Sequence, residues 1–192
     1  MENKFKKAIA LIDAKNSEDP NKVILDGAEH PKELLYSKRM TAKLMEIDNN
    51  ASEALQIAVR AQHICRWEIK RKSYPMDKVG YFNWRNDLKK MHSEITSTLL
   101  HDVGYDATFI DRVSFLINKK RIKKDEESQL LEDVVCLVFL EYYLEDFTAK
   151  HNDEKIIDIL QKTWNKMSSK GQELALQLNL SENSLRLIKK AL

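Results

Sequence analysis

Apolar residues along the chain recur at spacings of three and four, which is the period of amphipathic helices. Alternation with period two, which is typical of half-buried strands, occurs in few short stretches. Only four glycines and three prolines interrupt the 192 residues, so few positions break regular structure. These patterns predict an all-α fold: one compact helical bundle that forms a single domain over residues 1–192.

Capping residues indicate where the helices begin and end. Ser52, Asp106 and Asp125 each precede a helical pattern and fit the N-cap position, whereas Gly104 fits a left-handed C-cap. Pro31 fits the first position of a helix. Loops are expected over 16–30 and 68–80. The predicted helices cover 3–15, 31–47, 52–67, 81–103, 106 to the basic tract 118–124, 125–150, 153–167 and 181–191.

Composition narrows the class of protein but does not assign a function. The 32 basic and 30 acidic side chains leave a net charge of +2, which argues against a general polyanion binder. The two cysteines lie in apolar helical patterns, as expected in a reducing compartment. The longest apolar run, 134–140, is far shorter than the roughly 20 residues that cross a bilayer, and no signal-peptide core is seen at the N-terminus. We expect a soluble, cytoplasmic protein with no membrane partner.

A carboxylate pair stands at the start of the most apolar helix. Residues 134–140 are apolar on every face, which predicts a central helix, and Glu132 and Asp133 precede them. A carboxylate entering a core must be paired, hydrogen-bonded or bound to a metal. The alternative to a metal is that Asp133 or Glu132 stabilises the helix start or pairs with an arginine.

Two histidines complete a candidate metal site. His63 and His92 lie on or beside the apolar sides of two other predicted helices, where the alternative for each is a hydrogen-bonded core residue. Two imidazoles and a carboxylate suit a divalent ion such as Mn, Fe, Zn or Ni, which activates water near neutral pH. We predict His63, His92 and Asp133 as metal ligands and Glu132 as an outer-shell partner or a catalytic base. His101 and Asp102 form the rival site.

Basic and aromatic side chains interleave between residues 60 and 85. Guanidinium groups bind phosphate or carboxylate, and aromatic rings stack on a base. A solvated loop whose aromatics cover the core is the alternative, and Lys119 could instead balance the end of a helix. If the third helix persists beyond Trp67, the residues that share one face are His63, Arg66, Trp67 and Lys70. The predicted substrate-binding residues are Arg66, Trp67, Lys70, Tyr81, Arg85 and Lys119.

Four stretches carry a family resemblance over nearly the whole chain: PKELLYSKRMT, RAQHICRWEIKRKSYPMDKVGYFNWRNDL, LEDVVCLVFLEYY and EKIIDILQKTWNKMS. With them the chain resembles domain-of-unknown-function family 4202. The resemblance implies a self-contained domain of about this size and no established activity.

A looser resemblance is to the HD-domain metal-dependent phosphohydrolases, whose pattern is a His, a His-Asp pair and a distant Asp on separate helices. RAQHICRW would take the place of the His-Asp helix and LEDVVCLVFL that of the final Asp helix. Ile64 follows His63 where that family has Asp, and Tyr36 and Ser37 stand where a first His is expected. The resemblance implies an HD-like fold, and an oxygen-activating iron site is a variant of it.

Two hypotheses about function follow. The first is an enzyme, a metal-dependent hydrolase acting on an anionic, phosphorylated small molecule or nucleotide. The second is a non-catalytic helical module that binds a nucleotide, RNA or an acidic partner through residues 60–85. Metal content separates the two, and a steep salt dependence of binding would indicate RNA.

Overall fold

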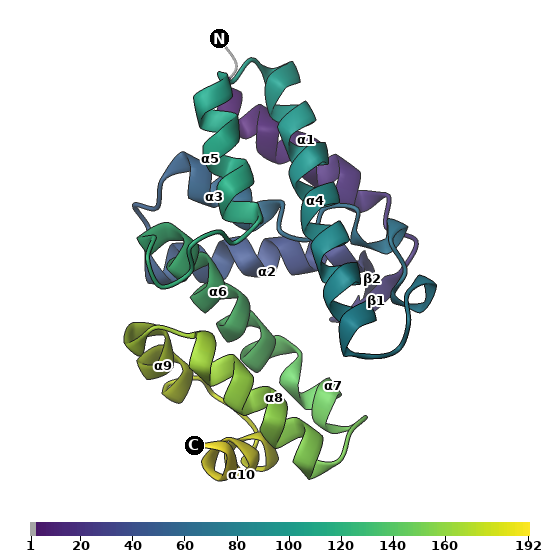
Figure 1. Ribbon diagram of the computed structural model, residues 1–192, viewed down its shortest axis with the longest axis vertical. Helices are drawn as coiled ribbons and strands as arrows, with labels where there is room; N and C mark the ends of the chain where they lie inside the picture. Colours follow the sequence, from purple (N-terminus) through teal and green to yellow (C-terminus); the bar gives the residue numbers. More distant parts are fainter. Residues whose placement is uncertain (1–2) are drawn as a thin grey trace. The chain divides into compact units, whose positions relative to one another are not determined.

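The computed structural model describes residues 3–192, which are mostly helical with one small hairpin (Figure 1). The chain forms two compact units. Unit 1 ends at Lys120, and unit 2 spans Arg121–Leu192. Within residues 3–192, no helix is both long and apolar enough to cross a membrane.

Unit 1 combines helices with the hairpin. Its elements are α1 (Lys4–Ser17), β1 (Lys22–Leu25), β2 (Ala28–Pro31), α2 (Lys32–Ile47), α3 (Glu53–Arg60), the 3-10 turns η1 (Arg66–Glu68) and η2 (Arg71–Ser73), α4 (Lys78–Val103) and α5 (Ala107–Ile117). Helix α1 packs against α2, α3 and α4, and α5 packs against α3 and α4. The core between them is apolar and includes Ile12, Met40, Leu44, Ile57 and Leu116.

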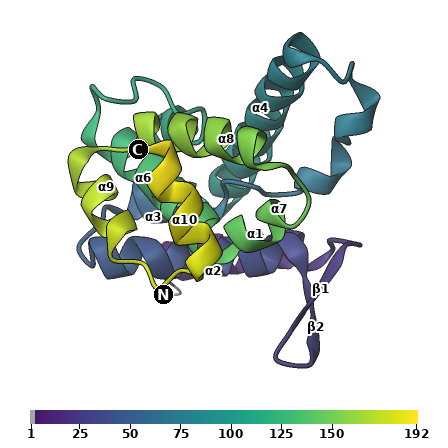
Figure 2. The ribbon, with the colours of Figure 1, turned by 90° about the horizontal axis from the view of Figure 1, so that it is seen from below.

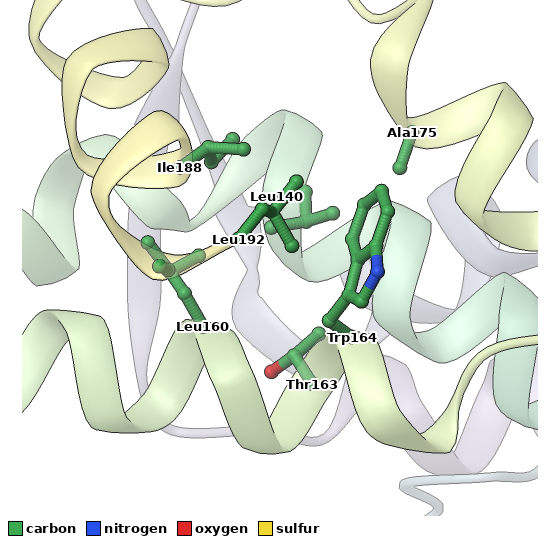
Figure 3. Close-up of a pocket in the computed structure, with 8 residues that line it drawn as sticks. Leu140, Leu160, Thr163, Trp164, Ala175, Ile188 and Leu192 are labelled. Carbon is green, nitrogen blue, oxygen red and sulfur yellow. The ribbon is translucent and has the colours of Figure 1, made fainter.

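Unit 2 contains α6 (Glu126–Tyr142), α7 (Leu144–Thr148), α8 (Asp153–Lys166), α9 (Ser169–Leu176) and α10 (Glu182–Ala191). Helix α6 packs against α7, α8 and α9, as expected for a helix that is apolar on nearly every face. Leu140, Leu160, Trp164 and Ile188 line an apolar gap of about 10 Å³ among these helices (Figure 3). That volume holds no more than one water molecule, so the gap is a packing space and not a ligand site.

The predicted caps are confirmed. The side chains of Ser52, Asp106 and Asp125 each accept a hydrogen bond from a backbone N–H in the first turn of α3, α5 and α6. Gly104 ends α4 with a φ of 91°, a left-handed conformation that glycine adopts without steric cost.

The hairpin is a correction to the all-α prediction, which expected a loop here. Strands β1 and β2 pair antiparallel, with Lys22 opposite Pro31 and Leu25 opposite Ala28. Asp26 and Gly27 form the turn with φ values of 50° and 77°, the backbone that an Asp-Gly hairpin turn requires. Figure 2 shows the hairpin standing out beside α2. Each strand has four residues, too short for a clear alternating pattern.

The predicted third helix is too long, and this changes the site. Helix α3 ends at Arg60, and Cys65 takes a left-handed φ of 53°. The backbone N–H of Cys65 donates to Oδ1 of buried Asn16 at 3.3 Å, which holds the turn against α1. His63, Arg66, Trp67 and Lys70 therefore do not share one helical face.

The C-terminal prediction also needs two corrections. The predicted helix over 125–150 is divided, because α6 ends at Tyr142 and α7 begins at Leu144. Helix α9 was not predicted, because its sequence is short and polar and carries a glycine.

Gly80 in the first turn of α4 should tolerate no side chain. A Cβ at this position would lie 2.1 Å from the carbonyl oxygen of Pro75. We expect Gly80→Ala to lower the free energy of unfolding by about 1–3 kcal/mol, because the loop or the helix must shift. Urea denaturation measures this loss. Asn83→Ala, at an exposed position one turn later, is the matched control and should be neutral or slightly stabilising. Equal stability of the two variants would contradict the prediction.

Candidate functional site

Five polar and aromatic side chains from three parts of unit 1 meet around His63. Glu33 and Tyr36 come from the first turns of α2, His63 and Arg66 from the segment after α3, and His92 from the middle of α4. We call these residues the His63 cluster. The cluster is largely enclosed, since the side chains of His63 and Glu33 are 20% and 8% exposed and His92 is 2% exposed.

The His63 imidazole is held on both nitrogens. Its Nδ1 lies 3.1 Å from Oε2 of Glu33, and its Nε2 lies 3.1 Å from Nη1 of Arg66. Because a guanidinium only donates, Nε2 is the acceptor, and Nδ1 carries the proton that is donated to Glu33. The ring of Tyr36 stacks on the imidazole with a centroid distance of 4.0 Å and an angle of 11°. These contacts select one tautomer and one ring orientation.

A buried aspartate positions Glu33. Oδ2 of Asp19 accepts the backbone N–H of Glu33 at 2.9 Å, and Oδ1 accepts the backbone N–H of Asn21 at 2.8 Å. Asp19 is fully buried, and a carboxylate at this end of α2 is favoured by the helix dipole. Sequence reasoning missed Asp19, Glu33 and Tyr36. One signal in the sequence could have identified two of them: Glu33 and Tyr36 are three residues apart at a helix start, so they lie on the same helical face.

His92 has only one of its two nitrogens bonded. The backbone carbonyl of Gln62 accepts a hydrogen bond from its ring, whereas Nε2 is buried without a hydrogen-bond partner among residues 3–192. The bonded nitrogen is therefore Nδ1, and Nε2 is a bare acceptor. The ring centroids of His92 and His63 are 6.0 Å apart, with an angle of 47° between the planes.

Two guanidinium groups of this region are not paired with any carboxylate among residues 3–192. Arg66 donates to His63 and lies over the ring of Trp84, with its Cζ 4.8 Å from the centroid. Trp84 is itself fixed, since its Nε1 donates to the carbonyl of Ile69 at 2.9 Å. Arg85, the next residue of α4, is half-buried and forms neither a hydrogen bond nor an ion pair with any described residue. Most of the N–H donors of both groups therefore have no hydrogen-bond partner among residues 3–192.

The charges make this region favourable for an anion. Burial lowers the pKa of His63 well below its ordinary value, and Arg66, Arg85, Lys119 and Lys32 lower it further. Burial, His63 and the same two arginines lower the pKa of His92.

The other members of the cluster respond to the same environment. Burial raises the pKa of Glu33 against the opposing effect of Arg66 and Lys32. Burial is also the main cause that lowers the pKa of Arg66, and Arg85 adds to it. The two imidazoles are thus neutral at pH 7, and cationic groups outnumber the single carboxylate.

The structure groups some of the predicted substrate-binding residues. Arg66 contacts His63 directly, and the charges of Arg85 and Lys119 act on its imidazole. The ring centroids of Tyr81 and Trp84 are 5.9 Å apart, and Arg66 lies over the ring of Trp84. Lys70 is exposed. Trp67 is half-buried, outside the face that was predicted for it.

Asp133 and Glu132 lie in unit 2, where both have protein partners. One oxygen of Asp133 accepts the backbone N–H of Ser168 at 2.8 Å and the side-chain amide of Gln129 at 2.9 Å, and the other accepts the Ser168 hydroxyl. Glu132 lies 3.9 Å from Nζ of Lys166. Asp133 thus anchors the residue that caps α9.

The predicted metal site stays a prediction. Among residues 3–192, no group of three or more His, Cys, Asp or Glu side chains lies in an arrangement that could hold a metal ion. Both nitrogens of His63 and both oxygens of Asp133 have protein partners, so the residues present do not form a ligand set, and we derive no step through a metal. The rival pair, His101 and Asp102, is exposed, with 3.7 Å between its nearest nitrogen and oxygen.

Comparison with known families gives one match. The model described as "Domain of unknown function (DUF4202)" matches residues 6–188. No match was found among curated proteins. The search of solved structures found no match either, and no resemblance to HD-domain proteins emerged from these comparisons.

The buried histidines should make the protein less stable in mild acid. Their pKa values are lowered in the folded state from an ordinary value of 6.5, so the unfolded chain binds more protons below that pH. Each histidine should then remove about 1.4 kcal/mol of stability for each pH unit below about 6.5. The raised pKa of Glu33 opposes part of this loss, since the folded state then binds its proton first.

Urea denaturation between about pH 7 and about pH 5.5 measures the effect. His92→Phe should remove close to half of the pH-dependent loss. His101→Ala, at an exposed histidine of the same helix, should leave the full loss in place. A wild-type protein that is equally stable at both pH values would show that the imidazoles are not buried in neutral form.

Asp133→Asn distinguishes a capping role from a metal-binding role. We expect it to lower the free energy of unfolding by about 1–2 kcal/mol in protein dialysed against EDTA, because charge-assisted hydrogen bonds to Ser168 are weakened. Gly171→Ala should have a similar effect, since a Cβ there would lie 2.7 Å from the Asp133 carboxyl carbon. A loss that appears only in metal-loaded protein would instead identify Asp133 as a ligand.

Proposed function

Because the chain belongs to the DUF4202 family, whose description assigns no activity, we propose its function from the His63 cluster: unit 1 binds the phosphoryl group of a small molecule or nucleotide and hydrolyses the phosphoester, with His63 as general base. The proposal rests on residues of unit 1 alone.

One observation carries the binding half of the proposal. Arg66 and Arg85 act on one small region, yet the hydrogen-bond partner of Arg66 is a neutral imidazole and Arg85 bonds to no described residue. Arg66 and Arg85 are both half-buried. Guanidinium groups that are partly removed from water usually pair with carboxylates, because desolvation of an uncompensated charge is costly. A phosphate dianion would supply the missing negative charge, and its oxygens match the planar donors of arginine.

The Glu33–His63 pair supports the catalytic half. His63 is neutral at pH 7 and therefore able to accept a proton at Nε2 once Arg66 turns toward the phosphate. Glu33 accepts the Nδ1 proton and stabilises the imidazolium that forms. In the proposed reaction the water oxygen bonds to phosphorus and the ester P–O bond breaks. One water proton passes to His63 and from there to solvent, and the leaving alkoxide, on the opposite side of phosphorus, takes a proton from a solvent water.

The second candidate function is a non-catalytic binding module. It is favoured by the exposed apolar side chains around the start of α4, where Met76, Val79 and Phe82 are 79%, 68% and 53% exposed. Exposed apolar groups beside lysines suit a binding surface. The two candidates differ in turnover, since a module would bind the anion and leave it unchanged.

Arg85→Ala provides the binding test. Because Arg85 forms no hydrogen bond or ion pair with described residues, its removal should leave stability nearly unchanged. The affinity for AMP, ATP or inorganic phosphate should fall about 10- to 100-fold in isothermal titration, the value of a charge-assisted contact. Lys90→Ala, on the same helix and 75% exposed at its side chain, is the matched control and should bind as the wild type does.

Turnover decides between the two functions. His63→Asn should keep most of the affinity for AMP and abolish the release of phosphate from it, whereas a module would show no phosphate release from AMP in the wild type. Activity that disappears with EDTA and returns with Mn²⁺ would identify the metal-dependent, HD-like form of the hydrolase. Absence of binding by the wild type would refute the proposed function.

A further inference from the structure

One buried atom of the His63 cluster, Nε2 of His92, has no hydrogen-bond partner among residues 3–192. Buried polar atoms are almost always hydrogen-bonded, because an unmade bond costs about 1–3 kcal/mol. Nε2 of His92 has no partner among residues 3–192, nor has Oε1 of neighbouring Gln62, which is also buried. Both atoms accept hydrogen bonds in the tautomer that the Gln62 carbonyl selects, so both lack a donor.

Anion binding would create another acceptor of the same kind. The Nε2 lone pair of His63 is occupied by Arg66, and it becomes bare if the guanidinium turns to a phosphate oxygen. A phosphate dianion has no protons to donate, so it satisfies the arginines and leaves the imidazoles unpaired. The ring centroids of the two histidines are 6.0 Å apart, a distance that a short hydroxylated carbon chain can span.

We propose that the ligand is the phosphate ester of a polyhydroxylated alcohol, a class that includes sugar phosphates and ribonucleotides, and that one of its hydroxyl groups donates to Nε2 of His92. The inference rests on the proposed function, since it requires the phosphoryl group to lie at Arg66 and Arg85. His92 then selects among phosphorylated compounds by their hydroxyl groups, whereas the arginines select for the phosphate alone. A site that binds a hydroxyl through a buried group discriminates strongly against an analogue that lacks it.

Matched pairs of compounds test the inference. Isothermal titration compares glycerol 3-phosphate with propyl phosphate, and AMP with its 2′,3′-dideoxy analogue, so that each pair shares its phosphoester and differs in hydroxyl groups. In at least one pair we expect the hydroxylated member to bind about 10- to 100-fold more tightly to the wild type. His92→Phe should abolish this difference while leaving the affinity of the deoxygenated member unchanged.

A second measurement does not depend on the variant. The ¹⁵N chemical shift of Nε2 in His92 should move when the hydroxylated compound binds to wild-type protein, and should stay unchanged with its deoxygenated partner. Circular dichroism and urea denaturation establish whether His92→Phe is folded.

Each outcome has a distinct meaning. If both members of both pairs bind equally, the hydroxyl inference is wrong and the proposed phosphate site survives. If no phosphorylated compound binds, the proposed function and the inference fall together. Stoichiometric binding of Zn²⁺ or Mn²⁺ that His92→Phe removes would overturn the inference in favour of a metal ligand.

Discussion

The contact between Glu33 and His63 is the interaction on which the candidate site depends. It joins the first turn of α2 to the irregular segment after α3 and determines which imidazole nitrogen is basic. Together with the guanidinium of Arg66 at Nε2, this contact fixes the tautomer of His63 and the direction of its lone pair. Two neighbouring contacts stabilise it: Asp19 accepts the backbone N–H of Glu33, and the ring of Tyr36 stacks on the imidazole of His63.

The regular parts of the fold could be predicted because their determinants are local. A side-chain oxygen at the N-cap bonds a backbone group two or three residues away, so Ser52, Asp106 and Asp125 mark helix starts from sequence alone. The end of α3 could not be predicted in this way. It depends on the left-handed turn at Cys65, which is stabilised by Asn16, a residue 49 positions earlier in the chain.

The candidate site could be predicted only in part, because residue types are visible in the sequence and long-range contacts are not. His63, His92, Arg66 and Arg85 carry chemistry that can be recognised by residue type, and the structure places them in one region. Within unit 1, the carboxylate that contacts His63 is that of Glu33, a pairing that only the tertiary fold determines. A buried carboxylate must be paired, hydrogen-bonded or bound to a metal, and Asp133 is hydrogen-bonded by Ser168 and Gln129.

The hairpin has a consequence for how this chain can vary. Its base is joined to the start of α2, because the backbone N–H of Lys32 donates to the carbonyl of Asn21 at 3.0 Å and Pro31 pairs with Lys22. The tip at Asp26 and Gly27 has no such tie to the helices, and nothing lies within 4 Å of a Cβ built on Gly27. Insertions at the tip are therefore tolerated in related chains, whereas an insertion at the base, next to Asn21 or Pro31, would displace Glu33, the carboxylate that orients the imidazole.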